Sequence, residues 1–172
     1  YTCPVVFKRW YHDVPVINKR FDKSITLTRQ NNTNAYQYSS GAFLPIGVNE
    51  GYGKAGSNGS QNGEFSCAIT TYFKYDAQNE ELIFEGDDDV WVFFNRHLGV
   101  DVGGLHSAWR KSIVLTEDLA REQLHMYRGG IYPIHIFQAE RCMGSSNFIL
   151  TLTGFVKMGV STCTSVCGDG IV

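Results

Sequence analysis

Three consecutive aspartates, Asp87, Asp88 and Asp89, are the residues of this sequence with the clearest chemical potential. They follow Gly86 and lie between two apolar stretches, so a short turn must hold them close together. Crowded carboxylates repel one another unless a cation or several hydrogen-bond donors compensate for their charge. Hard divalent cations such as Ca²⁺ take carboxylate, amide and carbonyl oxygens as ligands. Two interpretations remain open: a bound cation, or a solvated turn in which one aspartate caps backbone amides.

Two other polar segments could contribute to a site. Asp101–His106 contains a glycine pair that permits an unusual backbone path, and Asp101 and His106 could hydrogen-bond across it. Gln138–Asn147 offers amide, carboxylate and guanidinium groups in one loop between two apolar strands. The five histidines show no paired spacing, which argues against zinc. No nucleophile–base pair or activated cysteine is visible, so we do not expect an enzyme.

Composition limits the class of protein that holds these residues. The chain has 172 residues, of which 43% are hydrophobic and 19% charged, and this fits one domain with a single core. A formal net charge of −2 argues against a nucleic-acid-binding surface. No apolar run reaches the roughly 18 residues that a membrane helix needs, so we expect no direct membrane insertion. The 13% aromatic content and eighteen glycines favour β-structure.

The elements that position the acidic turn are therefore expected to be strands. Short apolar and aromatic segments predict an all-β fold, an antiparallel β-sandwich with long loops and at most one short helix, capped by Thr116. We expect a first strand at Val5–Tyr11 and a loop at Gln30–Gly41. The apolar run Val90–Phe94 predicts a strand buried on both faces, with Trp91 in the core. The predicted domain covers residues 1–158, and residues 159–172 look like the start of a following cysteine-rich segment.

Cysteines and glycosylation sequons indicate the compartment. The five cysteines are too few for a disulfide-packed miniprotein but common in a secreted β-domain. Because their number is odd, at least one of them cannot pair with another cysteine of this chain. Asn31 and Asn58 begin N-x-Ser/Thr sequons in polar stretches, so we expect both to be glycosylated. Together with the low charge, these features predict an extracellular location: secreted, at the cell surface or in the extracellular matrix.

Several sequence blocks resemble one family. The runs 84–95, 100–106, 136–141 and 146–148 occur in the order found in PA14 domains of the fibro-slime type. The resemblance covers roughly residues 40 to 156. It implies a β-sandwich module of extracellular adhesins and matrix proteins. The chain would then be part of a larger multi-module protein.

The resemblance also implies a cofactor and its ligands. Sugar-binding PA14 domains hold Ca²⁺ with two adjacent aspartates joined by a cis peptide. This pattern selects Asp87 and Asp88, with Asp89 as the variable third position, although a register one residue later is possible. The loop that starts at Gln138 would supply further ligands, Gln138 and Glu140. It departs from the sugar-binding members because Glu140-Arg141 replaces an Asn-rich stretch, and Arg141 could pair with Asp89 or Glu140.

The predicted function follows from this resemblance. We expect a Ca²⁺-dependent, lectin-like carbohydrate-binding module, with glycans or matrix glycoproteins as partners. The alternative is a structural or protein-binding module in which Ca²⁺ only rigidifies the loops. The residues expected to contact the ligand are Asp89, Trp109, Arg141 and Ser145.

The resemblance further suggests a disulfide arrangement. If both ends of the sandwich follow the family order, Cys67 would pair with Cys142 and Cys3 with Cys163. Four cysteines allow three connectivities, and sequence alone does not choose among them.

Overall fold

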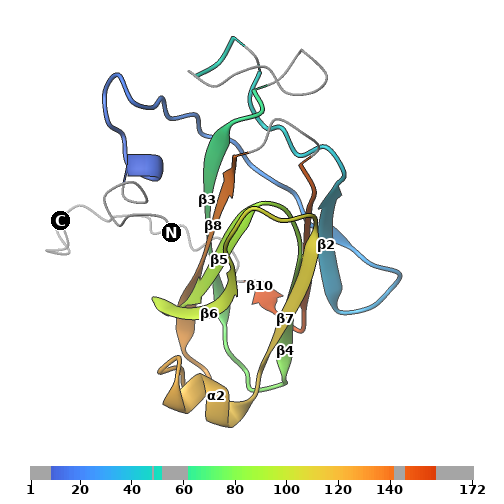
Figure 1. Ribbon diagram of the computed structural model, residues 1–172. Helices are drawn as coiled ribbons and strands as arrows, with labels where there is room; N and C mark the ends of the chain where they lie inside the picture. Colours follow the sequence, from blue (N-terminus) through green and yellow to red (C-terminus); the bar gives the residue numbers. More distant parts are fainter. Residues whose placement is uncertain (1–8, 48, 52–61, 142–145, 158–172) are drawn as a thin grey trace, which may run out of the picture.

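The computed structural model describes residues 9–47, 49–51, 62–141 and 146–157. Strands dominate these ranges and form two five-stranded sheets, which face each other as the layers of a sandwich (Figure 1). The strand pairs are antiparallel, so the predicted all-β, antiparallel sandwich is confirmed. No helix in these ranges has the length and hydropathy to cross a bilayer. The boundary predicted at residue 158 lies outside the described residues.

The strands of each sheet come from distant parts of the chain. The first sheet contains, in spatial order, β1 (Thr28–Arg29), β2 (Ala35–Ser40), β9 (Phe148–Thr153), β4 (Glu80–Gly86) and β7 (Trp109–Leu115). The second contains, in the same way, β10 (Val156–Lys157), β3 (Phe65–Lys74), β8 (Ile131–Glu140), β5 (Asp89–Phe94) and β6 (His97–Val102). Consecutive strands β4 and β5 therefore belong to different sheets, and the acidic turn crosses from one sheet to the other.

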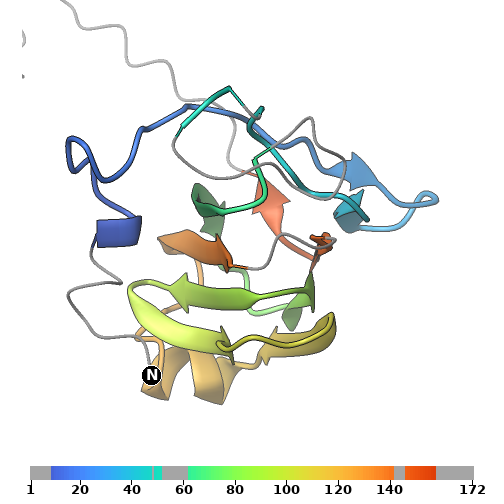
Figure 2. The ribbon, with the colours of Figure 1, turned by 45° about the horizontal axis from the view of Figure 1, so that its top comes forward.

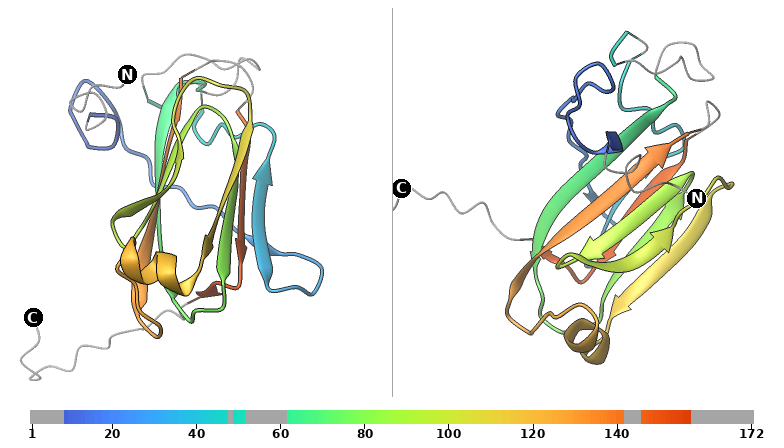
Figure 3. Two further views of the ribbon diagram at one scale, coloured as in Figure 1. Left: turned by 60° about the horizontal axis from the view of Figure 1, so that its bottom comes forward. Right: turned by 60° about the vertical axis from the view of Figure 1, so that its left-hand side comes forward.

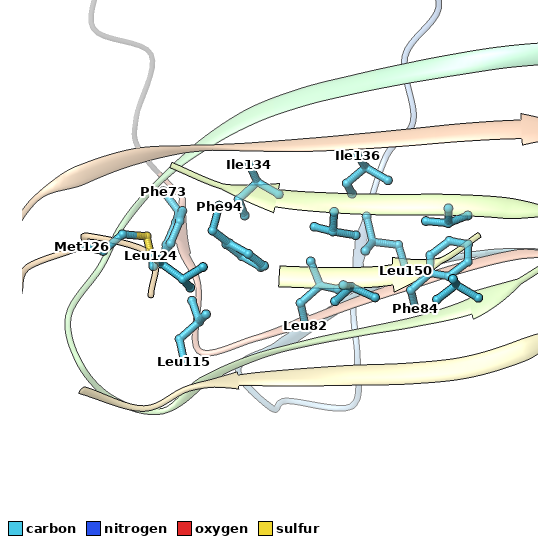
Figure 4. Packing of buried hydrophobic residues seen from close by; sticks show 14 of the residues in the cluster. Phe73, Leu82, Phe84, Phe94, Leu115, Leu124, Met126, Ile134, Ile136 and Leu150 are labelled. Atoms are coloured by element: carbon cyan, nitrogen blue, oxygen red, sulfur yellow. The ribbon is translucent and has the colours of Figure 1, made fainter. Parts of the chain in front are cut away.

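The core lies between the sheets and follows the two-residue period of the strands. In β5, Val90, Val92 and Phe94 are fully buried, whereas Trp91 and Phe93 lie on the outer face and are half-buried. The prediction that this strand is buried on both faces, with Trp91 in the core, is therefore wrong. The partner strands contribute a matching set of inward side chains (Figure 4), among them Leu82, Phe84, Ile134, Ile136 and Leu150. Burying each such side chain stabilises the fold by about 1.5–3 kcal/mol.

A short helix, α2 (Glu117–Glu122), closes one end of the sandwich (Figure 3). The Thr116 hydroxyl accepts a hydrogen bond from the amide of Leu119 at 3.3 Å, as the N-cap prediction requires. Ala120 of the helix is buried in the core at this end of the sandwich, as are Leu124 and Met126 just after the helix. The helix therefore covers apolar surface that the strands alone would leave exposed at this end.

Part of the segment expected to be a loop forms a strand, β2, between β1 and β9. Ala35–Ser40 is β2 and pairs along its whole length with β9. The ring of Tyr38 packs edge-on against Phe43 and Phe148, with centroids 5.9 and 6.0 Å apart. One inward aromatic side chain and a continuous hydrogen-bonded partner are thus enough to make a strand of a polar sequence.

The N-terminal segment does not form the strand expected at Val5–Tyr11 where it is described. Arg9 and Trp10 are helical, and the chain then runs along the open edge of the sandwich (Figure 2). Ile25 and Leu27 of this segment pack against the core cluster. The segment therefore covers an edge between the two sheets instead of extending either sheet.

Candidate functional site

The acidic turn, Gly86–Asp89, lies at the end of the sandwich opposite α2. Strands β4, β6 and β8 end here, while β5, β7 and β9 begin here. Gly86 is required by close packing, because a Cβ at this position would lie 2.4 Å from the carbonyl oxygen of Asn147. The three aspartates are nearly inaccessible, with exposed fractions of 8%, 4% and 2% for Asp87, Asp88 and Asp89. The turn is therefore not the solvated one that the sequence left open.

Asp87 is fixed by the residue that precedes β9. Its Oδ1 accepts a hydrogen bond from the amide of Asn147 at 2.6 Å, and its Oδ2 accepts one from Asn147 Nδ2 at 3.0 Å. The amide of Asp87 in turn donates to the carbonyl of Asn147 at 3.4 Å. Sequence reasoning did not name Asn147 as a site residue, although it lies in the second polar loop and in the family block 146–148. The two loops are thus joined by neutral donors, which orient the carboxylate without cancelling its charge.

Asp88 and Gln138 connect the acidic turn to the end of β8. The peptide bond between Asp87 and Asp88 is cis, at the pair that the family resemblance selects. Asp88 Oδ2 accepts a hydrogen bond from the backbone amide of Arg141 at 3.1 Å. Gln138 is fully buried, and its Nε2 donates to the carbonyl of Asp87 at 3.2 Å. Its Oε1 has no hydrogen-bond partner among the described residues.

Asp89 has different partners from its two neighbours. Its Oδ1 accepts a hydrogen bond from the amide of Gly104 at 2.6 Å. Its Oδ2 lies 2.5 Å from Nε of Arg141, and the guanidinium also lies over the ring of Trp10, 5.9 Å from the centroid. Burial and the nearby Asp89 raise the pKa of Tyr11 above its usual range. The N-terminal segment thus forms one wall of the site, which the sequence did not indicate.

One ion pair, that of Asp89 with Arg141, compensates for part of the charge of the acidic turn. Glu140, at the end of β8, is a further buried carboxylate. Within the described ranges, no three acidic, histidine or cysteine side chains converge closely enough to hold a metal ion together. An ion here would therefore rely on at most two carboxylates, supplemented by neutral oxygens. The amide oxygen of Gln138 and the hydroxyl of Ser146, both buried and without hydrogen-bond partners in the described ranges, are of this type.

Trp109 lies directly beside the acidic turn. It is the β7 partner of Gly86 in the strand register, and 57% of its surface is exposed. Its indole stacks on the ring of His106, with centroids 4.4 Å apart and planes within 6°. His106 contacts the carbonyls of Val102 and Ser107, and the hydrogen bond expected between His106 and Asp101 is absent. The result is an exposed flat aromatic surface next to buried carboxylates.

The remaining predicted residues are only partly covered by the structure. Ser145, Asn58 and the cysteines Cys3, Cys142 and Cys163 lie outside the described residues. Cys67 is a free thiol in β3, and burial raises its pKa to about 11. The predicted pair Cys67–Cys142 is therefore not confirmed, and the pair Cys3–Cys163 stays a prediction. Asn31 lies in an exposed turn before β2, where a glycan would meet no obstacle from burial.

Fold and site together define a class: an antiparallel β-sandwich whose loops at one end gather buried aspartates. The family model described as PA14 domain matches residues 45–167. The chain belongs to the PA14 domain family. Proteins with this domain are typically extracellular or at the cell surface, and PA14 domains often bind carbohydrates.

Curated relatives agree with this assignment. Protein psiQ of Dictyostelium discoideum is 33% identical over 96% of this chain, protein psiD of the same organism 33% over 95%, and protein psiR 32% over 95%. These are PA14 proteins of the fibro-slime type, as the resemblance indicated. The chain spans only 19%, 32% and 17% of their lengths, respectively. No solved structure matches the chain.

Proposed function

We propose that this domain is a Ca²⁺-dependent carbohydrate-binding module of a secreted or cell-surface adhesin. One observation carries the proposal: Asp87 and Asp88 are adjacent and buried, and the hydrogen-bond donors to their carboxylates among the described residues are all neutral amides. Burying an ionised carboxylate is costly unless a cation compensates for it. The guanidinium of Arg141 is already engaged by Asp89. A divalent cation at Asp87 and Asp88 would supply the missing positive charge.

The oxygens around the pair suit a hard cation. Asp87 and Asp88 would hold Ca²⁺, with the amide oxygen of Gln138, which has no hydrogen-bond partner among the described residues, as a further ligand. When bound, Ca²⁺ offers open coordination positions to adjacent hydroxyls of a sugar. Asn147 holds Asp87 in place through both of its carboxylate oxygens, so little reorganisation is needed on binding.

The residues around Asp87 and Asp88 could contact a sugar ring. Trp109 and His106 form a flat, exposed surface beside Gly86, where the apolar face of a pyranose could stack. Arg141 is about one-third exposed and offers hydrogen-bond donors to the hydroxyls of the same ligand. A single shallow site of this kind is expected to bind with a Kd between about 1 μM and 1 mM. Useful adhesion would then require several copies on one surface.

The partners that follow from this function are glycans and glycoproteins of cell surfaces or the extracellular matrix. The family is typically extracellular, and glycosylation at Asn31 and Asn58 would fit that compartment. The domain would act as one module of a longer chain, because it spans a third or less of the lengths of psiQ, psiD and psiR.

The test is a glycan array probed in millimolar Ca²⁺ and again in excess EGTA, followed by NMR titration with the monosaccharides of the best glycans. We expect binding only with Ca²⁺, loss of binding in Asp88→Asn, and at least tenfold weaker binding in Trp109→Ala, corresponding to about 1.4 kcal/mol. The matched control is Asp118→Asn. Asp118 is an exposed aspartate on α2, at the opposite end of the sandwich.

The outcomes separate this proposal from its main alternative. Ca²⁺ binding without binding of any glycan would replace it with a structural module whose loops the ion rigidifies. Glycan binding that persists unchanged in EGTA would refute the role of the ion. Equal losses in Asp88→Asn and Asp118→Asn would point to general destabilisation.

A further inference from the structure

Two histidines meet at the end of the sandwich where α2 lies. His97 opens β6, and His125 follows α2, 28 positions later in the sequence. Their ring centroids are 4.7 Å apart, and the ring planes are inclined by 74°. His97 is half-buried and His125 exposed, so solvent reaches the pair. Although the histidines show no paired spacing in the sequence, folding brings two of them side by side.

The backbone around this pair is held by a single side chain. Asn95 occupies the turn between β5 and β6, and its Nδ2 donates to the carbonyls of Leu124 and His125 at 3.0 and 3.1 Å. These bonds join the turn that leads into His97 to the segment that carries His125. The proximity of the two imidazoles thus comes from a fixed backbone arrangement and not from a chance contact of long side chains.

The ring nitrogens of the pair are not used elsewhere in the described structure. His106 contacts two backbone carbonyls through its nitrogens, and His135 is hydrogen-bonded to Thr70 at 3.0 Å. Neither His97 nor His125 has a side-chain hydrogen bond to any described residue. An imidazole without such a bond remains available as a metal ligand in its neutral form.

We propose that His97 and His125 form a binding site for a borderline transition-metal ion, Cu²⁺, Ni²⁺ or Zn²⁺. Imidazole nitrogens suit these ions, and hard Ca²⁺ prefers oxygen. With metal–nitrogen bonds of about 2.1 Å, two imidazoles on one ion have ring centres roughly 4.5–5.5 Å apart. The observed 4.7 Å lies within that range, so the spacing of the two rings is compatible with a shared ion. Water, or a donor from another molecule, would complete the coordination.

This site is independent of the acidic turn. Asp89 begins β5 and Phe94 ends it, so the strand's six residues, about 20 Å, separate the acidic turn from Asn95. The two sites also differ in the class of donor atom and therefore in the preferred ion. The proposal does not depend on sugar or Ca²⁺ binding.

The first experiment uses the unaltered protein. Cu²⁺ is added to about a tenth of the protein concentration in millimolar Ca²⁺, which occupies any oxygen-rich site, and NMR spectra are recorded. Paramagnetic broadening should centre on the signals of His97 and His125 and their neighbours. Broadening centred on another histidine or on the acidic turn, or none with Cu²⁺ at equimolar concentration, would refute the site.

The second experiment measures affinity by calorimetry with Zn²⁺, Ni²⁺ and Cu²⁺ alone. We expect one ion per chain, and at least tenfold weaker binding in His97→Gln and in His125→Ala. His12→Ala is the matched control, because His12 is an exposed histidine that makes no ring contact with another histidine. Asp88→Asn should also leave the affinity unchanged. Unchanged affinity in both pair variants, checked for folding by circular dichroism, would overturn the proposal.

Discussion

Arg141 forms its ion pair with Asp89 and not with Asp87 or Asp88, although all three carboxylates lie in one turn. The strand geometry explains this choice. Asp89 is already part of β5 and pairs in register with Ala139, so its side chain leaves the sheet on the outer face, where Trp10 also meets the guanidinium. Asp87 and Asp88 are consequently left with neutral donors, so a cation bound there, as proposed, would compensate for their charge.

If a cation occupies that pair, its removal should lower the stability of the domain. At a hundredfold excess of Ca²⁺ over its Kd, binding stabilises the native state by about 2.7 kcal/mol. We therefore expect excess EGTA to lower the Tm by roughly 5–10 °C, measured by calorimetry. Asp88→Asn should abolish the dependence on Ca²⁺, and Asp118→Asn should retain it. A Tm that is the same with and without EGTA in the unaltered protein would contradict a bound ion.

Removing the guanidinium should destabilise the domain without removing the proposed ion. In Arg141→Gln, the buried Asp89 keeps the Gly104 amide but loses its cation. Because Arg141 is partly exposed, we expect a loss of about 1–3 kcal/mol in the free energy of unfolding, measured with urea in EGTA. Adding Asp89→Asn should recover part of it. If Arg141→Gln also abolished the Tm response to Ca²⁺, the assignment of the ion to Asp87 and Asp88 would be wrong.

Asn147 is expected to organise the site without touching the ion. Asn147→Ala removes the donor to Asp87 Oδ2 and leaves a nearly buried carboxylate oxygen without that partner. We expect a loss of about 1–3 kcal/mol in stability and a Ca²⁺ affinity lower by about 10-fold or more. Calorimetric Ca²⁺ titration and urea unfolding measure the two effects. The exposed Asn34, changed to Ala, is the control and should alter neither.

The thiol of Cys67 should react slowly in the folded protein after any disulfides have been reduced. Burial raises its pKa to about 11, so the folded state retains the proton over a pH range in which the unfolded state loses it. This contribution to stability is fully present below about pH 8.5 and is lost as the pH rises toward 11. Alkylation by iodoacetamide, followed by mass spectrometry, should accelerate about tenfold per pH unit between 8 and 10. A rate that levels off near pH 8.5 would show that the thiol is not buried.

Much of the fold could be predicted because strand alternation is local. Val90–Phe94 consists of apolar residues with turn signals at its ends, and it forms most of strand β5. The start of helix α2 could likewise be predicted, because the capping hydroxyl of Thr116 bonds an amide only three residues away. The segment around Ala35–Ser40 could not be assigned, because its strand depends on pairing with β9, more than a hundred residues away.

The sequence by itself determined the class of this protein: the run of three aspartates, the strand pattern and the family blocks are all visible without coordinates. Only the tertiary structure decided which partner each aspartate has. Asn147, Arg141 and Gly104 reach the acidic turn from other strand ends, so no local spacing encodes these contacts. The pairing of His97 with His125 has the same origin. Side chains distant in sequence become neighbours where strands of the two sheets and the loops between them end together, and that arrangement depends on the packing of the whole core.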